Sequence, residues 1–153
     1  DNSNSNSNLD NNNISNENTQ QQSSDERLGE KISFKEVPLP PRDLLPLQKD
    51  SSGNYLQGVF YNGYMSGQGI DPGNNVWLIQ VLSDKGHNVQ VEEIRKVGNT
   101  YNIYVNIRYD YDVQYNGLPL TFGFFQASKT DMPGTAEVKV YDVDNPGTPL
   151  LSK

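Results

Sequence analysis

The stretch Tyr101-Asn102-Ile103-Tyr104-Val105-Asn106-Ile107-Arg108-Tyr109 decides the fold of this chain. Large apolar or aromatic residues occupy every second position, and the positions between them hold two Asn, one Tyr and one Arg. A period of two places alternate side chains on opposite sides of a pleated strand. The stretch therefore predicts a β-strand with one face buried in a core.

The segments before this stretch also have strand character. Residues 76–82 (VWLIQVL) are apolar on both faces, which is typical of a strand covered on two sides. Residues 89–94 begin with the same alternation, and short polar turns containing Gly86 and Gly98 separate the three segments. We predict that the three segments form a meander.

Further strands are predicted at residues 55–61, 118–126 and 137–143, with Val138 and Val140 directed inward. No stretch has a convincing 3.6-residue apolar period, and Gly and Pro recur about every eight to fifteen residues. This pattern predicts an all-β fold with little helix. We expect residues 53–153 to form a small antiparallel β-sandwich or a partly open barrel.

The first 52 residues differ in composition from the rest. Residues 1–27 are almost entirely Asn, Ser, Gln, Asp and Glu, and a segment of this kind cannot bury enough apolar surface to order itself. We therefore predict a disordered polar tether over residues 1–30. Residues 31–52 are rich in Pro, which predicts an extended lead-in that packs on the domain through its leucines, Leu44, Leu45 and Leu47.

Charge and residue content exclude several classes of function. The chain has 19 acidic and 12 basic residues, a net charge of -7, and its basic residues are scattered. Nucleic-acid binding needs a clustered positive face, so we expect no nucleic-acid partner. Cysteine is absent, which excludes disulfides and thiol catalysis. No cofactor motif is present, and we predict no cofactor.

The search for catalytic residues gives little. His87 is the single histidine, and it lies in a turn without a nucleophile motif around it. Glu92 and Glu93 are adjacent in a predicted strand, so their side chains point to opposite faces and cannot flank one scissile bond. We predict that the protein is not an enzyme. The alternative is a carboxylate-based hydrolase that acts on a cell-wall or carbohydrate substrate.

Two Asp-x-Asp pairs are the best candidates for a metal site. Each pair places its carboxylates on one side of a strand, and Ca²⁺ prefers oxygen ligands of this type. The pairs are also typical of simple turn chemistry at a strand end. The candidate ligands are Asp110, Asp112, Asp142 and Asp144.

Two groups of aromatic residues are candidates for binding. The glycine-rich loop at residues 61–73 carries aromatic and thioether side chains on an adaptable backbone, and a second group follows the best strand. The two groups form a recognition patch if they share one end of the domain. Otherwise Tyr61 and Tyr109 face the core and the other rings are isolated. The candidate binding residues are Tyr61, Tyr64, Met65, His87, Tyr109, Tyr111 and Tyr115.

The order of strands and turns from Val76 to Leu118-Pro119-Leu120-Thr121 resembles the C-terminal domain of PrcB-type lipoproteins, which associate with surface proteases and stabilise them. It is more distantly similar to chagasin-like inhibitors of cysteine proteases. Those domains usually carry Thr-Gly-Gly-Tyr or a similar turn where this chain has Asp84-Lys85-Gly86-His87-Asn88. For this reason the resemblance transfers the position of the turn and no functional residue.

The layout of a polar leader before a small β domain resembles that of a surface lipoprotein. It implies an extracellular, lipid-anchored binding or accessory module at the cell surface, with membrane attachment through the anchor alone. The expected partner is another protein, such as a surface protease, and a carbohydrate ligand is a further option. A structural component of the cell envelope is the third alternative.

Overall fold

A computed structural model describes residues 27–63, 69–82, 88–108, 115 and 117–153. Strands dominate these ranges, and the 3-10 turn η1 at Arg42–Leu44 is a short helical element in the lead-in. In the described part of the chain, no helix has the length and apolar character needed to cross a membrane. The strands are β2 Glu30–Lys31, β3 Lys35–Glu36, β4 Gly58–Gly63, β5 Asn74–Leu82, β6 Asn88–Val97, β7 Thr100–Arg108, β8 Leu120–Ser128, β9 Glu137–Asp142 and β10 Leu151–Ser152.

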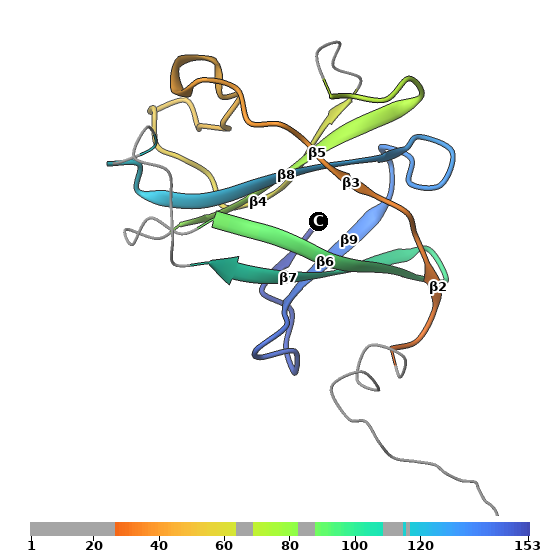
Figure 1. Ribbon diagram of the computed structural model, residues 1–153. Coiled ribbons are helices and arrows are strands. Elements are labelled where there is room, and N and C mark those ends of the chain that lie inside the picture. Colours follow the sequence, from red (N-terminus) through yellow and green to blue (C-terminus); the bar gives the residue numbers. More distant parts are fainter. Residues whose placement is uncertain (1–26, 64–68, 83–87, 109–114, 116) are drawn as a thin grey trace, which may run out of the picture.

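The strands form one strongly curved sheet with the order β10-β9-β7-β6-β8-β5-β4 (Figure 1). Strands β4 and β10, at the two ends of this order, contact each other, so the sheet is a nearly closed barrel. Most neighbouring strands are antiparallel, but β7 and β9 run parallel along six residue pairs. The predicted all-β fold with a partly open barrel is therefore confirmed.

The predicted meander of β5, β6 and β7 is wrong in one respect. Strands β6 and β7 do form a hairpin, but β8 pairs with β5 along its whole length and separates β5 from β6. The physical reason lies in the faces of the strands. All of β8 except its last residue is buried, like most of β5, whereas several side chains of β6 remain partly or fully exposed. Beside β5, strand β8 can therefore continue a core on both faces of the sheet. Strand β6 cannot do so, because several of its side chains are exposed.

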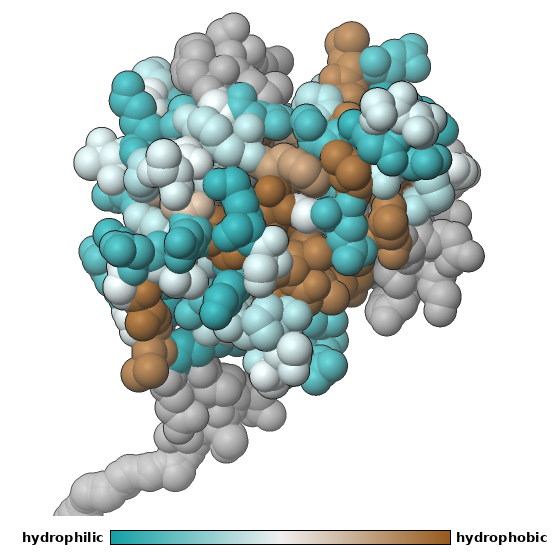
Figure 2. Space-filling view, turned by 180° about the vertical axis from the view of Figure 1, so that it is seen from behind, coloured by the Kyte–Doolittle hydropathy of each residue, from teal (hydrophilic) through white to brown (hydrophobic). Residues whose placement is uncertain are grey.

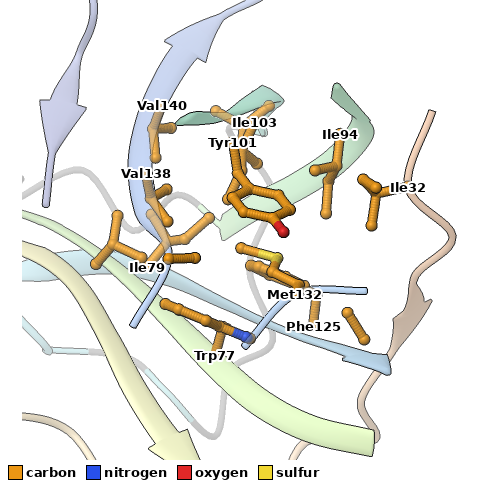
Figure 3. Close-up of a cluster of buried hydrophobic side chains, with 14 of the residues drawn as sticks. Ile32, Trp77, Ile79, Ile94, Tyr101, Ile103, Phe125, Met132, Val138 and Val140 are labelled. Atoms are coloured by element: carbon orange, nitrogen blue, oxygen red, sulfur yellow. The ribbon is translucent and has the colours of Figure 1, made fainter. Parts of the chain in front are cut away.

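Two hydrophobic cores lie on the two faces of the β5–β8 pair. The inner core fills the barrel, where Trp77 and Phe125 stack with their ring centroids 6.3 Å apart (Figure 3). The outer core lies outside the barrel, between this pair of strands and the Pro-rich lead-in. The double coverage explains the run of apolar residues on both faces of β5. Its fully buried members alternate between the outer and the inner core: Val76, Trp77, Leu78 and Ile79.

The lead-in covers the outer core as the sequence predicts, with one exception. Leu45 and Leu47 pack against the outer core, but Leu44 is 69% exposed. The side chains of Gln80 and Gln126, both fully buried, hold the backbone of the lead-in and of the segment after residue 68 against the sheet. Of the predicted tether, residues 1–26 lie outside the described ranges, and residues 27–30 lie beside β6.

Strand β6 contains a β-bulge that explains its unusual spacing of apolar residues. Val91 pairs with Val105 and Glu93 pairs with Tyr104, so Glu92 is the extra residue. A bulge reverses which side chains point inward. Val89 therefore faces the inner core before the bulge and Ile94 faces it afterwards, while Glu93 is directed away from that core.

Candidate binding groove between strands β6 and β8

The candidate site is a groove where two neighbouring strands of the barrel diverge. Strands β6 and β8 form a single ladder pair, Asn88 with Phe122, and then separate. They can approach each other at this point because residue 123 is glycine, since a Cβ atom there would lie 2.1 Å from the carbonyl oxygen of Val89. Beyond the contact, the widening gap is crossed by the chain segment that carries β2 and β3 (Figure 1).

The groove has a volume of about 270 Å³ and combines apolar walls with a polar rim. Strand β8 contributes two aromatic walls, Phe122 and Phe124, whose rings meet edge to face. On the rim, Arg108 donates a hydrogen bond to the Gln90 side chain at 3.1 Å. Gln90 in turn donates a 3.5 Å bond to the carboxylate of Glu36. A few aimed polar groups around apolar walls are typical of ligand sites.

The walls of the groove are fixed from behind by the outer core. The Tyr115 ring meets the Phe122 ring edge to face at 5.6 Å, and the Tyr115 hydroxyl donates a 2.9 Å hydrogen bond to the carbonyl oxygen of Pro40. Tyr115 therefore joins the lead-in to the aromatic wall. Walls that are held by buried contacts are a requirement for a preformed site.

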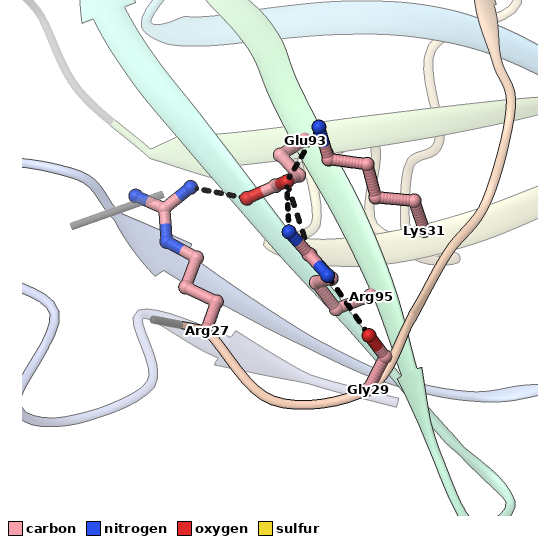
Figure 4. A network of polar contacts seen from close by, with 5 residues as sticks. All are labelled: Arg27, Gly29, Lys31, Glu93 and Arg95. Atoms are coloured by element: carbon pink, nitrogen blue, oxygen red, sulfur yellow. Dashed lines mark hydrogen bonds and ion pairs between the residues drawn. The ribbon is translucent and has the colours of Figure 1, made fainter. Parts of the chain in front are cut away.

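A cluster of charged side chains fastens the N-terminal segment to β6 (Figure 4). The Glu93 carboxylate accepts a 2.7 Å hydrogen bond from Arg27 and a 3.0 Å hydrogen bond from the Nε atom of Arg95. The ammonium of Lys31 lies 3.7 Å from the same carboxylate. Arg95 also donates to the carbonyl oxygen of Gly29 at 2.9 Å. The Arg27 guanidinium stacks 4.0 Å from the centre of the Tyr104 ring.

The pKa of Glu93 is held below its ordinary value. Burial by itself would raise this pKa, but the hydrogen bonds and positive charges of Arg27 and Arg95 outweigh the burial. Glu93 is thus an ionised structural carboxylate, and a general acid would need the opposite shift. The pKa of Tyr104 is raised, mainly because burial disfavours its charged form.

We expect the free energy of unfolding of the Glu93→Gln variant to differ most from that of the parent protein near neutral pH. A carboxyl group whose pKa is lowered by folding contributes stability above its unfolded pKa and loses it as the pH falls through its folded pKa. Urea unfolding from pH 7 to pH 3 should therefore show a stability gap that begins to shrink below about pH 5. A gap that stays constant down to pH 3 would contradict the role given to the Glu93 charge.

We expect Arg27→Ala to lower the free energy of unfolding by about 1 to 2 kcal/mol at pH 7, because it removes a charged hydrogen bond from a mostly buried carboxylate. Urea denaturation checks this value. Lys129→Ala is the control, since Lys129 is an exposed cation for which we expect a change within about 0.5 kcal/mol. Equal effects of the two substitutions would show that Arg27 contributes no more than an ordinary surface charge.

The sequence-predicted aromatic residues are only partly described, and those that are described lie apart. Tyr61 is 40% exposed and packs edge to face on Trp77 of the inner core at 5.1 Å. Tyr115 is buried in the outer core. The two rings therefore lie on opposite faces of the sheet. The remaining predicted binding residues lie outside the described ranges: Tyr64, Met65, His87, Tyr109 and Tyr111.

One of the two Asp-x-Asp pairs is described, and it takes part in a turn. The Asp142 carboxylate accepts a 2.9 Å hydrogen bond from the backbone N–H of Asp144, and the N–H of Asn145 donates to the carbonyl oxygen of Asp142 at 2.9 Å. Within the described ranges, no three His, Cys, Asp or Glu side chains form a group that could hold a metal ion. Asp110 and Asp112 lie outside these ranges.

Sequence reasoning did not single out the residues of the groove. Gln90 and Arg108 lie on strands that were predicted, but they looked like ordinary polar positions of an exposed face. Glu36 lies in the lead-in, 54 residues before Gln90. The one available signal was Gly123, a glycine inside a strand, which often marks a close approach of another backbone.

Comparisons with known proteins identify no relative. No protein-family model, no curated protein and no solved structure matches this chain.

Proposed function

We propose that the protein is an extracellular, lipid-anchored binding or accessory module, and that it contacts another protein through the groove between β6 and β8. The observation that carries the proposal is the groove itself, with its phenylalanine walls and its hydrogen-bonded rim of Arg108, Gln90 and Glu36. Aromatic residues and arginine are enriched in protein interfaces. A surface protease is one partner of this kind, as the resemblance to PrcB-type lipoproteins implies.

The distribution of carboxylates favours binding over the hydrolase alternative. Glycoside hydrolysis needs two carboxyl groups on either side of one bond, about 5 to 10 Å apart. Three clefts formed by described residues each contain a single carboxylate, from Glu36, Asp43 and Glu137 in turn. The pKa of Glu93 is lowered by Arg27 and Arg95, which is the opposite of the shift that a general acid needs.

The surface pattern supports the same proposal. Figure 2 shows apolar side chains gathered near the middle of the face seen from behind, with hydrophilic residues around them. An apolar patch with a polar rim is typical of a surface that meets another protein.

A photocrosslinking experiment tests the proposal. Leu39 lines the groove and is 46% exposed, while Leu44 lies in the same lead-in, is 69% exposed and does not line the groove. We expect a photoreactive residue at position 39 to give one crosslinked product with a protein of the native cell surface. The same residue at position 44 is the matched control and should give none.

A second variant connects the crosslink to the groove. In the chain that carries the photoreactive residue at position 39, Gln90→Ala breaks the hydrogen-bonded rim, and we expect it to reduce the yield of the crosslinked product several-fold. Equal products at positions 39 and 44, or a yield that Gln90→Ala leaves unchanged, would contradict the proposed site.

A further inference from the structure

The groove is bordered by a segment of the chain that crosses from one diverging strand to the other. We call residues 27–37 the N-terminal strap. Its strand β2 pairs with β6 at Lys96 and Arg95, and its strand β3 pairs with β8 at Gln126 and Phe125. Between them, the N–H of Ile32 donates a 2.9 Å hydrogen bond to the carbonyl oxygen of Ile94. The strap thus occupies the gap as an added strand.

The side chains of the strap show what the gap recognises. Ile32 points into the inner core (Figure 3) and is 7% exposed, and Phe34 packs against the same core. The charged residues of β2 and β3 are all exposed. The gap therefore selects an extended backbone with two apolar side chains two positions apart, and it places little demand on the other positions.

The strap uses a small part of the strands on which it lies. It forms ladder pairs with two residues of β6, which is ten residues long, and with two residues of β8, which is nine residues long. Added strands bind mainly through main-chain hydrogen bonds, and alternate side chains in pockets give specificity. A longer extended segment can pair with more of β6 than the strap does.

We propose that the gap between β6 and β8 is a strand-acceptor site, in which the strap is the resident strand. The partner is an extended protein segment with apolar residues two positions apart, as Ile32 and Phe34 are, and charged residues beside them. This inference rests on the proposed protein-binding function and names the form of its ligand. Exchange of the resident strand for the partner strand places side chains of the partner where Phe34, Glu36 and Val37 now line the groove.

The way in which the strap is attached is compatible with its exchange for a partner strand. At its beginning, Arg27 attaches it to Glu93 by a side-chain contact. At its end, the carbonyl oxygen of Glu36 accepts a 3.1 Å hydrogen bond from the buried Gln126 side chain. The chain then continues into Pro38, Pro40 and Pro41, which have no backbone N–H to donate to either strand. The strap is therefore held at its beginning by the Glu93 cluster, and the release of that contact frees it from one end.

A reversible lock makes the site testable on the full chain. Glu30 and Lys96 are directly opposite each other in the antiparallel ladder, at a separation that suits a disulfide. The chain contains no cysteine, so the double variant Glu30→Cys with Lys96→Cys can form one disulfide only. The oxidised form locks the strap in place, and reduction removes the lock.

The probe is a fluorescent synthetic peptide of residues 27–37, and its binding is measured by fluorescence anisotropy. The strap competes from within the same chain at a high effective concentration, so weakening it should favour the peptide. We expect the peptide to bind Arg27→Ala at least about tenfold more tightly than the parent chain. The oxidised double variant should bind no peptide, and reduction should restore binding. The control peptide carries Ile32→Asp and Phe34→Asp and should not bind.

Each result decides the proposal. Binding that responds to the lock and to the two apolar residues supports a strand-acceptor site. Equal binding by the oxidised and reduced forms, or no binding to Arg27→Ala at millimolar peptide, overturns it. If the peptide result is negative but position 39 still crosslinks to a partner, the proposed protein-binding function stands and the strand-acceptor site does not.

Discussion

Gly123→Ala is expected to lower the free energy of unfolding by about 3 kcal/mol or more, and this is one of the two largest effects predicted for the chain. A Cβ atom at position 123 would lie 2.1 Å from the carbonyl oxygen of Val89 and 3.0 Å from its carbonyl carbon. Both atoms belong to the backbone of β6, which cannot rotate away as a side chain can. The substitution therefore forces β6 and β8 apart at the point where they meet.

The matched control is Gly147→Ala. A Cβ atom at position 147 meets no atom within 4 Å, and its backbone does not adopt a positive φ. We expect this control to change stability by less than about 1 kcal/mol, in either direction. Urea unfolding of both variants checks the prediction. Similar stabilities for the two variants would mean that β6 and β8 do not make the close contact on which the groove depends.

Gln126→Leu is expected to cost about 3 to 4 kcal/mol, because it leaves several buried polar groups without a partner. The side-chain oxygen of Gln126 accepts hydrogen bonds from the N–H of Asp71 at 2.9 Å and from the Asn74 amide at 3.0 Å. Its amide nitrogen donates to the carbonyl oxygens of Glu36 at 3.1 Å and Gly69 at 2.6 Å. A leucine of similar size keeps the volume and removes all four bonds.

The control for Gln126→Leu is Gln90→Leu. Gln90 makes its hydrogen bonds on the groove rim, where they are exposed, so its former partners can bond to water. We expect that control to lose less than about 1 kcal/mol. Denaturant unfolding compares the variants, and amide hydrogen exchange at Asp71 reports the lost bond directly. An unchanged exchange rate at Asp71 would contradict the account of Gln126 as the residue that holds this segment.

Local patterns predict strands well in this chain because each strand carries its own period. The alternation from Tyr101 onward is confirmed in β7, where Tyr101, Ile103 and Val105 are buried. The double-faced apolar run of β5 is confirmed in the same way, since each of its faces meets a separate core. The period of the apolar residues is a property of a few consecutive positions, so it can be read from the sequence alone.

The candidate site is a different case, because its parts are distant along the chain. Glu36, Gln90 and Arg108 belong to three separate elements. The β6–β7 hairpin brings Gln90 close to Arg108, and the pairing of β3 with β8 brings Glu36 to the same rim. Tyr115 looked like a loop residue for binding, yet it is buried against Phe122 and bonded to Pro40. A contact across 75 residues has no local signature.

By itself, the sequence determined the class of the fold, with strands in place of helices, and the approximate bounds of the six longer strands, β4 to β9. Those features follow from side-chain alternation and turn residues, which act over a few positions. The tertiary structure alone decided that β8 lies between β5 and β6, that the strap crosses the gap, and that Glu93 is enclosed by Arg27 and Arg95. Strand order depends on which faces fit together in two cores, and that fit is settled between segments far apart in the chain.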